Sequence, residues 1–324
     1  MTLGWRLGRR LGPLPLTRRD VLRTGALAAL ALPLAGCDLG ATGYSTGPDP
    51  LLPLLARAEA DARAAGALAE SAPRHAQLAQ QVVAVRTAHA DALRAEIERQ
   101  NSPRPERAAG GDPGAVADLA ALGQRLTEAR EEALGLVPAV PRYRAGLVGS
   151  VAAGCAGVQQ LARELGAGQP GALGPVSTGP LPPEAVNALR QALAAEHAAV
   201  WVYGLVSAFL PAAYDRGVTE GAAAHRDRRD ACERVLDAAG AESVPAEPAY
   251  LTPEPVTDEA SATAVVATAE ADAALAWRGV LERTDDEGLR TMAAGALVGS
   301  ATRGTSWRAE AGREPAAVPL PGTP

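Results

Sequence analysis

The acid and imidazole side chains that could do chemistry in this chain are few, and the most suggestive are Glu196, His225 and Glu270. Carboxylate and imidazole groups are common metal ligands in proteins. A di-iron centre in a helical bundle needs one Glu from each of two helices and a Glu-x-x-His pair from each of the other two. Ala222 stands where the Glu partner of His225 would be, and the last predicted helix has no His. Two carboxylates are too few to balance two dications, so the residues predict at most a single metal ion.

An alternative interpretation makes the same three side chains a buried hydrogen-bonded network with arginine counter-charges. Three arginines could supply the counter-charge: Arg228, Arg229 and Arg303. Tyr203 lies seven residues after Glu196 on the same helical face, where its hydroxyl could reach the carboxylate or lie in the core. Buried carboxylates are tolerated when they are paired and hydrogen-bonded. We favour the network and expect no cofactor, with one metal ion as the alternative.

The first half of the chain has a similar but weaker pattern, with Glu59, His89 and Glu128 at corresponding places. Arg86 stands where the Glu partner of His89 would be, and residues 143–161 contain no Asp, Glu or His. Each half therefore keeps half of a di-iron ligand set. The sequence also shows no phosphate-binding loop, no Cys-x-x-Cys pair and no Ser/His/Asp constellation in a familiar context. An enzyme is accordingly disfavoured.

Composition and chain breaks predict the elements that position these residues. Ala, Leu and Val dominate the 47% of hydrophobic residues and favour helices, whereas aromatics make up only 3%, so the predicted class is all-α. Pro and Gly separate eight predicted helices, near 51–68, 73–99, 113–136, 141–166, 184–209, 218–238, 258–283 and 286–311. In each half the connections are short, long and short. That order is typical of a four-helix bundle with one long crossover, as in ferritin-like folds.

Two such bundles in tandem define the predicted domains. They are an N-terminal helical bundle (51–166), a Pro/Gly linker (167–183), a ferritin-like four-helix bundle (184–312) and a disordered tail (313–324). Cys155 and Cys232 lie one in each bundle. They could form a disulfide outside the cytoplasm or remain buried free thiols.

The second half also resembles a known family over about residues 183–312. The resemblance rests on Pro248-Ala249-Tyr250, on Arg303 and Trp307, and on two strings, Ala194-Ala195-Glu196-His197-Ala198-Ala199-Val200-Trp201-Val202-Tyr203-Gly204 and Ala224-His225-Arg226-Asp227-Arg228-Arg229-Asp230. These residues are similar to an actinobacterial ferritin-like domain family of unknown function. The resemblance implies a ferritin-like bundle and no established activity.

The N-terminus resembles an export signal with a lipid anchor. Residues 17–22 resemble the twin-arginine motif, with Val21 where a large apolar residue is common, and an apolar run follows over 25–34. That run is too short to span a bilayer. Leu34-Ala35-Gly36-Cys37 then resembles a bacterial lipobox, which predicts cleavage before Cys37, acylation of its thiol and a flexible tether over 38–50. The alternative is an ordinary secretory signal with a chance cysteine.

The net charge of the mature chain disfavours two classes of partner. Removing the six arginines and one aspartate of residues 1–37 from the 31 basic and 37 acidic residues leaves a mature chain with net charge −11. This balance argues against nucleic acid and against docking on anionic lipid by charge alone. We expect a non-catalytic lipoprotein on the outer face of the cytoplasmic membrane, held there by acylated Cys37. Its helical bundles would bind or contact an envelope partner, and the alternative is a metal-binding or redox protein.

Overall fold

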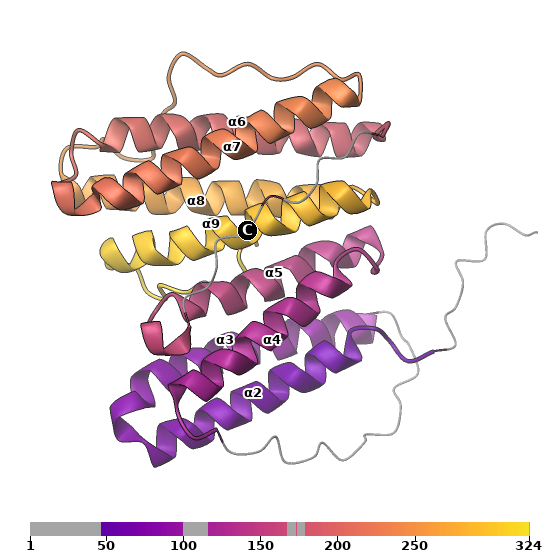
Figure 1. Ribbon diagram of the computed structural model, residues 1–324, viewed down its shortest axis with the longest axis vertical. Helices are drawn as coiled ribbons and strands as arrows, with labels where there is room; N and C mark the ends of the chain where they lie inside the picture. Colours follow the sequence, from indigo (N-terminus) through magenta and orange to yellow (C-terminus); the bar gives the residue numbers. More distant parts are fainter. Residues whose placement is uncertain (1–46, 100–115, 167–172, 174–178, 324) are drawn as a thin grey trace, which may run out of the picture. The chain divides into compact units, whose positions relative to one another are not determined.

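The computed structural model describes residues 47–99, 116–166, 173 and 179–323, and no strand occurs among them. The predicted all-α class is confirmed. In the first half the helices are α2 (Leu52–Ser71), α3 (Ala76–Arg99), α4 (Leu119–Leu136) and α5 (Arg142–Gln159). In the second half they are α6 (Pro183–Val206), α7 (Asp215–Ala238), α8 (Glu259–Leu281) and α9 (Glu287–Glu310) (Figure 1).

The described residues from Pro48 onward belong to one compact unit. The predicted signal, Cys37 and most of the tether lie outside the described residues, as does most of the linker over 167–183. Within the described part of the chain, no helix has both the length and the apolar character needed to cross a bilayer.

Local side-chain chemistry explains where the helices of the second half begin. Pro183 occupies the first turn of α6, where a missing N–H costs nothing. Asp258 and Ser261 form a reciprocal capping box at the start of α8. The carboxylate of Asp286 accepts a hydrogen bond from the backbone N–H of Leu289 at 2.7 Å and caps α9. Each start falls within three residues of the predicted one.

Helix α5 departs most from its predicted span, because it ends at Gln159 rather than near residue 166. The side-chain amide of Gln159 donates to the carbonyls of Gly123 and Leu165, each at 3.1 Å. These bonds fix a short 3₁₀ turn, η2 (Arg163–Leu165), against α4.

Each half packs as a group of four helices. In the first half α2 contacts α3 and α4, and α5 contacts α3 and α4. In the second half α6 contacts α7 and α8, and α8 contacts α9. The connection over 239–258 between α7 and α8 is the long one of the second half, as the Pro-rich sequence predicts.

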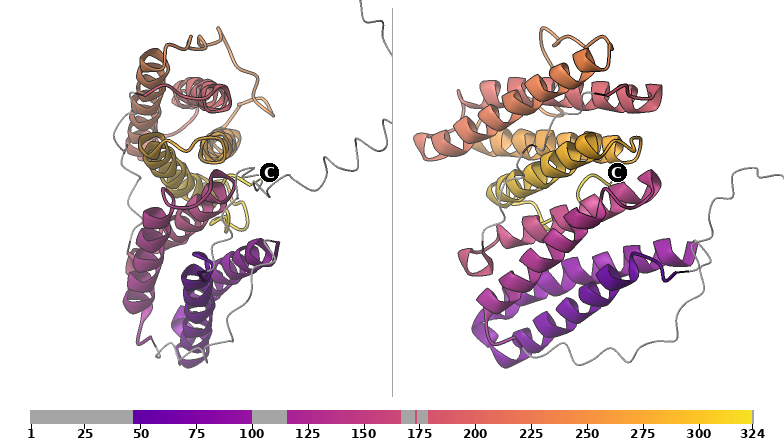
Figure 2. Two further views of the ribbon diagram at one scale, coloured as in Figure 1. Left: turned by 90° about the vertical axis from the view of Figure 1, so that its right-hand side faces the viewer. Right: turned by 45° about the vertical axis from the view of Figure 1, so that its right-hand side comes forward.

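The two halves contact each other mainly through α5, which packs on α9 and α8. Both further views show α5 next to α9 (Figure 2). Every residue over 148–159 is buried, so α5 lies between other elements on all sides. Small residues make this possible: a Cβ added to Gly149 would lie only 2.6 Å from a methyl group of Leu281. One apolar core cluster therefore draws on both halves.

The prediction of a disordered tail is wrong for residues 313–323. Ser150 of α5 donates a hydrogen bond to the carbonyl of Pro321 at 2.7 Å, and Ala317 is buried. A Cβ added to Gly154 would lie 2.0 Å from the carbonyl oxygen of Pro319, so the tail passes directly over α5. A Pro-rich segment has little conformational entropy to lose on docking, and buried donors satisfy its carbonyls.

Cys155 and Cys232 are both buried and free. Of the two alternatives that the sequence leaves open, the structure has the free thiols. Burial raises the pKa of both thiols, so they stay protonated and act as small core side chains.

Candidate functional site

Three side chains that the sequence singles out meet in the core of the second half. Glu196 of α6, His225 of α7 and Glu270 of α8 are fully buried. Nδ1 of His225 lies 2.5 Å from Oε2 of Glu196, and Nε2 of the same ring lies 3.1 Å from Oε1 of Glu270. The imidazole therefore bridges two carboxylates that come from different helices.

The partners of His225 determine its protonation state. An ionised carboxylate can only accept a hydrogen bond, so each ring nitrogen facing one must carry a proton. Burial alone would lower the pKa of His225, but the charges of Glu270 and Glu196 outweigh it and raise that pKa. Burial likewise opposes ionisation of both carboxyls, yet the neighbouring cations hold their pKa values below the usual range. The trio is therefore carboxylate, imidazolium, carboxylate.

Two arginines complete the charges around the trio. Nε of Arg303 donates to Oε1 of Glu270 at 2.7 Å. Nη1 of Arg228 donates to the hydroxyl of Ser300 at 2.8 Å and lies 3.8 Å from Oε1 of Glu196. Burial, together with the charge of Arg303, lowers the pKa of Arg228 to about 10. We call Glu196, His225, Glu270, Arg228 and Arg303 the buried charge cluster.

Arg229, a predicted candidate for the network, lies outside the buried charge cluster. Its side chain is half-buried and pairs with Asp230 at 2.7 Å. One residue along a helix is a rotation of about 100°, so Arg228 faces the core while its neighbour faces outward.

Aromatic side chains enclose the cluster and donate to it. The hydroxyl of Tyr203 donates to Oε1 of Glu270 at 2.7 Å, and not to the carboxylate of Glu196 that the seven-residue spacing suggests. The indole N–H of Trp307 donates to that hydroxyl at 2.9 Å, and the indole N–H of Trp277 donates to Oε1 of Glu196 at 2.5 Å. The sequence marks neither indole as a donor to the acids. A Trp between apolar helix faces gives no sign in the sequence of where its N–H points.

The donor set of the trio does not fit a metal ion. A metal ligand needs a free lone pair on an imidazole nitrogen, and both nitrogens of His225 are committed as donors. Glu270 is already neutralised by Arg303, whose guanidinium would lie beside any added cation. Across the described residues, no group of three or more His, Cys, Asp or Glu side chains has a metal-binding arrangement.

The first half has a buried polar group of different composition. His89 is buried, but Glu59 and Glu128 are not: they pair with Arg94 and Arg57 at the surface, so the predicted correspondence of these two residues is wrong. The buried acid is Asp61 of α2. Its signal in the sequence is weak: Asp61 falls on the stripe formed by Leu54, Ala58, Ala65 and Leu68, but alanines also occupy the other faces of α2.

Asp61 is paired with two arginines, and His89 is neutral. Nη2 of Arg86 lies 3.0 Å from Asp61, and Nε of Arg125 lies 2.8 Å from it. Nη1 of Arg86 also contacts Nδ1 of His89 at 2.8 Å, and Nε2 of that ring contacts the carbonyl of Pro319 at 2.7 Å. A guanidinium only donates and a carbonyl only accepts, so the ring is neutral with its proton on Nε2. Burial and the Arg86 charge lower its pKa to about 3.

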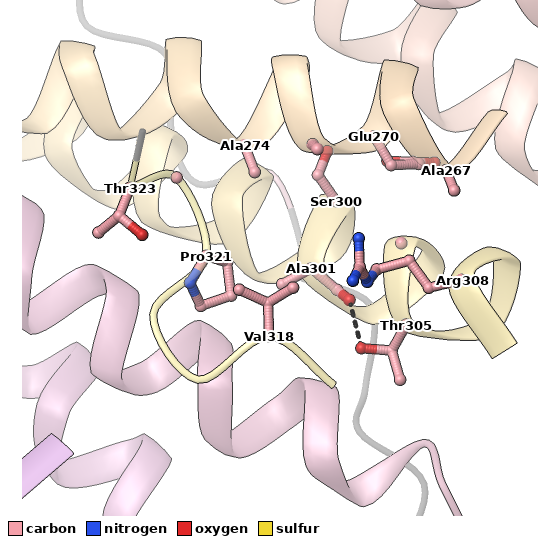
Figure 3. Close-up of a pocket in the computed structure, with 13 residues that line it drawn as sticks. Ala267, Glu270, Ala274, Ser300, Ala301, Thr305, Arg308, Val318, Pro321 and Thr323 are labelled. Atoms are coloured by element: carbon pink, nitrogen blue, oxygen red, sulfur yellow. Dashed lines mark hydrogen bonds between the residues drawn. The ribbon is translucent and has the colours of Figure 1, made fainter. Parts of the chain in front are cut away.

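A pocket of about 220 Å³ lies beside the buried charge cluster. Glu270 and Ser300 contribute to its wall, and the rest of the wall comes from α8, from α9 and from the tail (Figure 3). Small residues of the two helices, among them Ala267, Ala274 and Ala301, leave this space between them. This hollow is therefore in direct contact with the predicted site.

Comparisons with known proteins show which family and which solved structure the second half is similar to. A family model described as a domain of unknown function, DUF4439, matches residues 188–324. The crystal structure of a conserved hypothetical protein, Rv2844, from Mycobacterium tuberculosis is 37% identical over 40% of this chain and 93% of that chain, with a TM-score of 0.39. No curated protein gives a significant match. The matched residues contain the whole buried charge cluster and the pocket.

Proposed function

Because this chain belongs to the DUF4439 family of actinobacterial proteins, whose name assigns no activity, we infer its function from its own site. We propose that it is an exported lipoprotein, anchored through Cys37, whose ferritin-like bundles serve as a non-catalytic binding module of the cell envelope. The observation that carries the non-catalytic part is the commitment of both His225 nitrogens to carboxylates. A side chain held in this way is available neither as a general base nor as a metal ligand.

The ferritin-like assignment is supported by the order of the connections in the second half. The links α6–α7 and α8–α9 are short, and the link over 239–258 is long. In such bundles facing helices carry inward acids and imidazoles, as α6, α7 and α8 do here. In this chain arginine charges take the place of the metal charges, so the buried polar groups would serve to fix helix register.

The anchor is tested by fractionating cells that express the full chain. Cys37→Ala should move the protein from the membrane fraction to the soluble fraction, because two acyl chains give stable anchoring and none would remain. Cys155→Ala is the matched control, since it removes a buried thiol from the folded unit and should leave the protein with the membranes. Full retention of the Cys37→Ala protein in the membrane fraction would contradict the anchor.

The absence of catalysis by a bound metal is tested by metal analysis of protein purified after export by its own signal. We expect substoichiometric iron, manganese, zinc and copper in a folded protein. Near-stoichiometric metal that is lost in Glu196→Ala would contradict the proposal.

That result would instead support a second candidate, a metal-binding or redox protein with one ion on Glu196, His225 and Glu270. The convergence of these three side chains on one point favours it. Metal binding there would require loss of a proton from His225 and movement of Arg303 away from Glu270. Affinity should then rise with pH, because protons compete with the metal for the ring.

A further inference from the structure

The pocket beside the buried charge cluster has an apolar wall and a charged end. Alanines of α8 and α9 form one side, and Val318 and Pro321 of the tail form the other (Figure 3). Its volume of about 220 Å³ is below the range of about 300–1,000 Å³ that suits drug-sized ligands. A ligand that fills it must therefore be small and mostly apolar.

The charged end is provided by Arg308 of α9, which lines the pocket. Its Nε and Nη2 both donate to the carbonyl of Pro315, at 3.0 and 2.9 Å. Within the described residues no carboxylate forms an ion pair with this guanidinium, and Glu314 attracts it only at longer range. Partial burial and the charge of Arg313 both lower its pKa, which means that the positive charge is poorly compensated where it stands.

The wall next to the cluster adds to the positive potential. Ser300 is fully buried and accepts from Arg228 at 2.8 Å, which holds that guanidinium behind the wall. Behind it the buried charge cluster holds three cations and two carboxylates when His225 is protonated, a net charge of +1. The acid of the wall, Glu270, is already bonded through Oε1 to Tyr203, His225 and Arg303. An anion is thus the charged group that this end accepts.

We propose that this pocket binds a small amphipathic carboxylate. The carboxylate would accept hydrogen bonds from the N–H groups of Arg308 that do not bond to Pro315. The hydrocarbon part would lie along the alanines and under the tail, where its methylenes are removed from water. The inference rests on the proposed role as a binding module and assigns it a ligand class.

The test uses sodium octanoate as the probe and isothermal titration calorimetry on the acylated protein in detergent, with 1-octanol as the uncharged comparison. Octanoate should bind the wild type, and 1-octanol should bind at least about tenfold more weakly, because a charge-assisted hydrogen bond is worth at least 1.4 kcal/mol. Arg308→Gln should weaken octanoate by about tenfold or more. Its matched control, Arg216→Gln, makes the same charge change on the exposed face of α7 and should change nothing.

A second variant tests the apolar part without touching a charge. Ala271 lines the pocket but is exposed, so Ala271→Leu should obstruct the pocket and leave the fold intact. Ala260→Leu is the control, an exposed alanine of α8 that does not line the pocket. Lack of octanoate binding, equal binding to all four variants, or equal affinity for 1-octanol would overturn the inference. Fractionation and metal analysis do not involve the pocket, so they test the proposed function independently of the octanoate experiment.

Discussion

Replacing Glu270 by glutamine is the most direct perturbation of the buried charge cluster. Oε1 of this residue accepts from Tyr203, His225 and Arg303, and glutamine keeps its size and one carbonyl oxygen. What the variant loses is one negative charge. Three buried or nearly buried cations would then face the single carboxylate of Glu196.

The loss of folding stability in Glu270→Gln follows from the burial of the cations that this carboxylate contacts. Removing one member of a buried ion pair destabilises by about 3–5 kcal/mol, because the other charge stays desolvated without its partner. The side chain of Arg303 is 14% exposed, so water offsets part of its loss and the lower end of that range applies. For a folded unit of this size each kcal/mol shifts the melting temperature by about 2–4 °C. We therefore expect Glu270→Gln to melt about 6–12 °C below the wild type.

The assay is thermal unfolding followed by circular dichroism at neutral pH. Glu128→Gln is the matched control, because it makes the same charge change on an acid at the surface of the first half. Its carboxylate is 48% exposed and pairs with Arg57 at 3.3 Å, an interaction worth about 0–1 kcal/mol. Equal melting temperatures for the two variants would refute the reasoning, since Glu270 would then balance no buried charge.

Two further predictions concern pH and the tail. The pKa of His225 is raised in the folded state, so its stabilisation is present at low pH and is lost as the pH rises through the folded pKa. The pKa shift of His89 has the opposite sign, because its pKa in the folded state is about 3 against an ordinary 6.5. The stability that its neutral ring provides is therefore lost as the pH falls from 6.5 to 3. His89→Gln should therefore flatten the acid side of a stability–pH curve measured by urea unfolding, and an unchanged acid side would contradict the neutral ring. Gly154→Val adds a side chain whose Cβ would lie only 2.0 Å from the carbonyl oxygen of Pro319, so it should expel the tail and make it cleavable by protease, whereas Gly66→Val, at an open position, should not.

The helices and the central trio follow from the sequence because their signals are local. Pro and Gly mark the breaks, and the helical period places Glu196, His225 and Glu270 on inward faces that any four-helix packing brings together. The spacing from Glu196 to Tyr203 is two turns, so both face inward, but the acid that Tyr203 contacts is Glu270 of α8 rather than Glu196.

Other features depend on tertiary packing that the sequence does not encode locally. Ala-rich helices have a weak apolar stripe, so the choice between Glu59 and Asp61 turned on about 200° of helix rotation that only the packing fixes. The tail is Pro-rich and has no helical or strand period, and its order comes from Ser150 and His89, which are far away in the chain. Nothing in the tail's own residues indicates these partners.

The central claim is that His225 is a buried imidazolium held between two carboxylates. The chain has only four histidines, so ¹⁵N-labelled histidine and a His225→Gln comparison would assign this ring by nuclear magnetic resonance. At neutral pH the account predicts a proton on both ring nitrogens of His225 and on only one of His89. A His225 ring with an unprotonated nitrogen, whether free or bound to a metal ion, would contradict it.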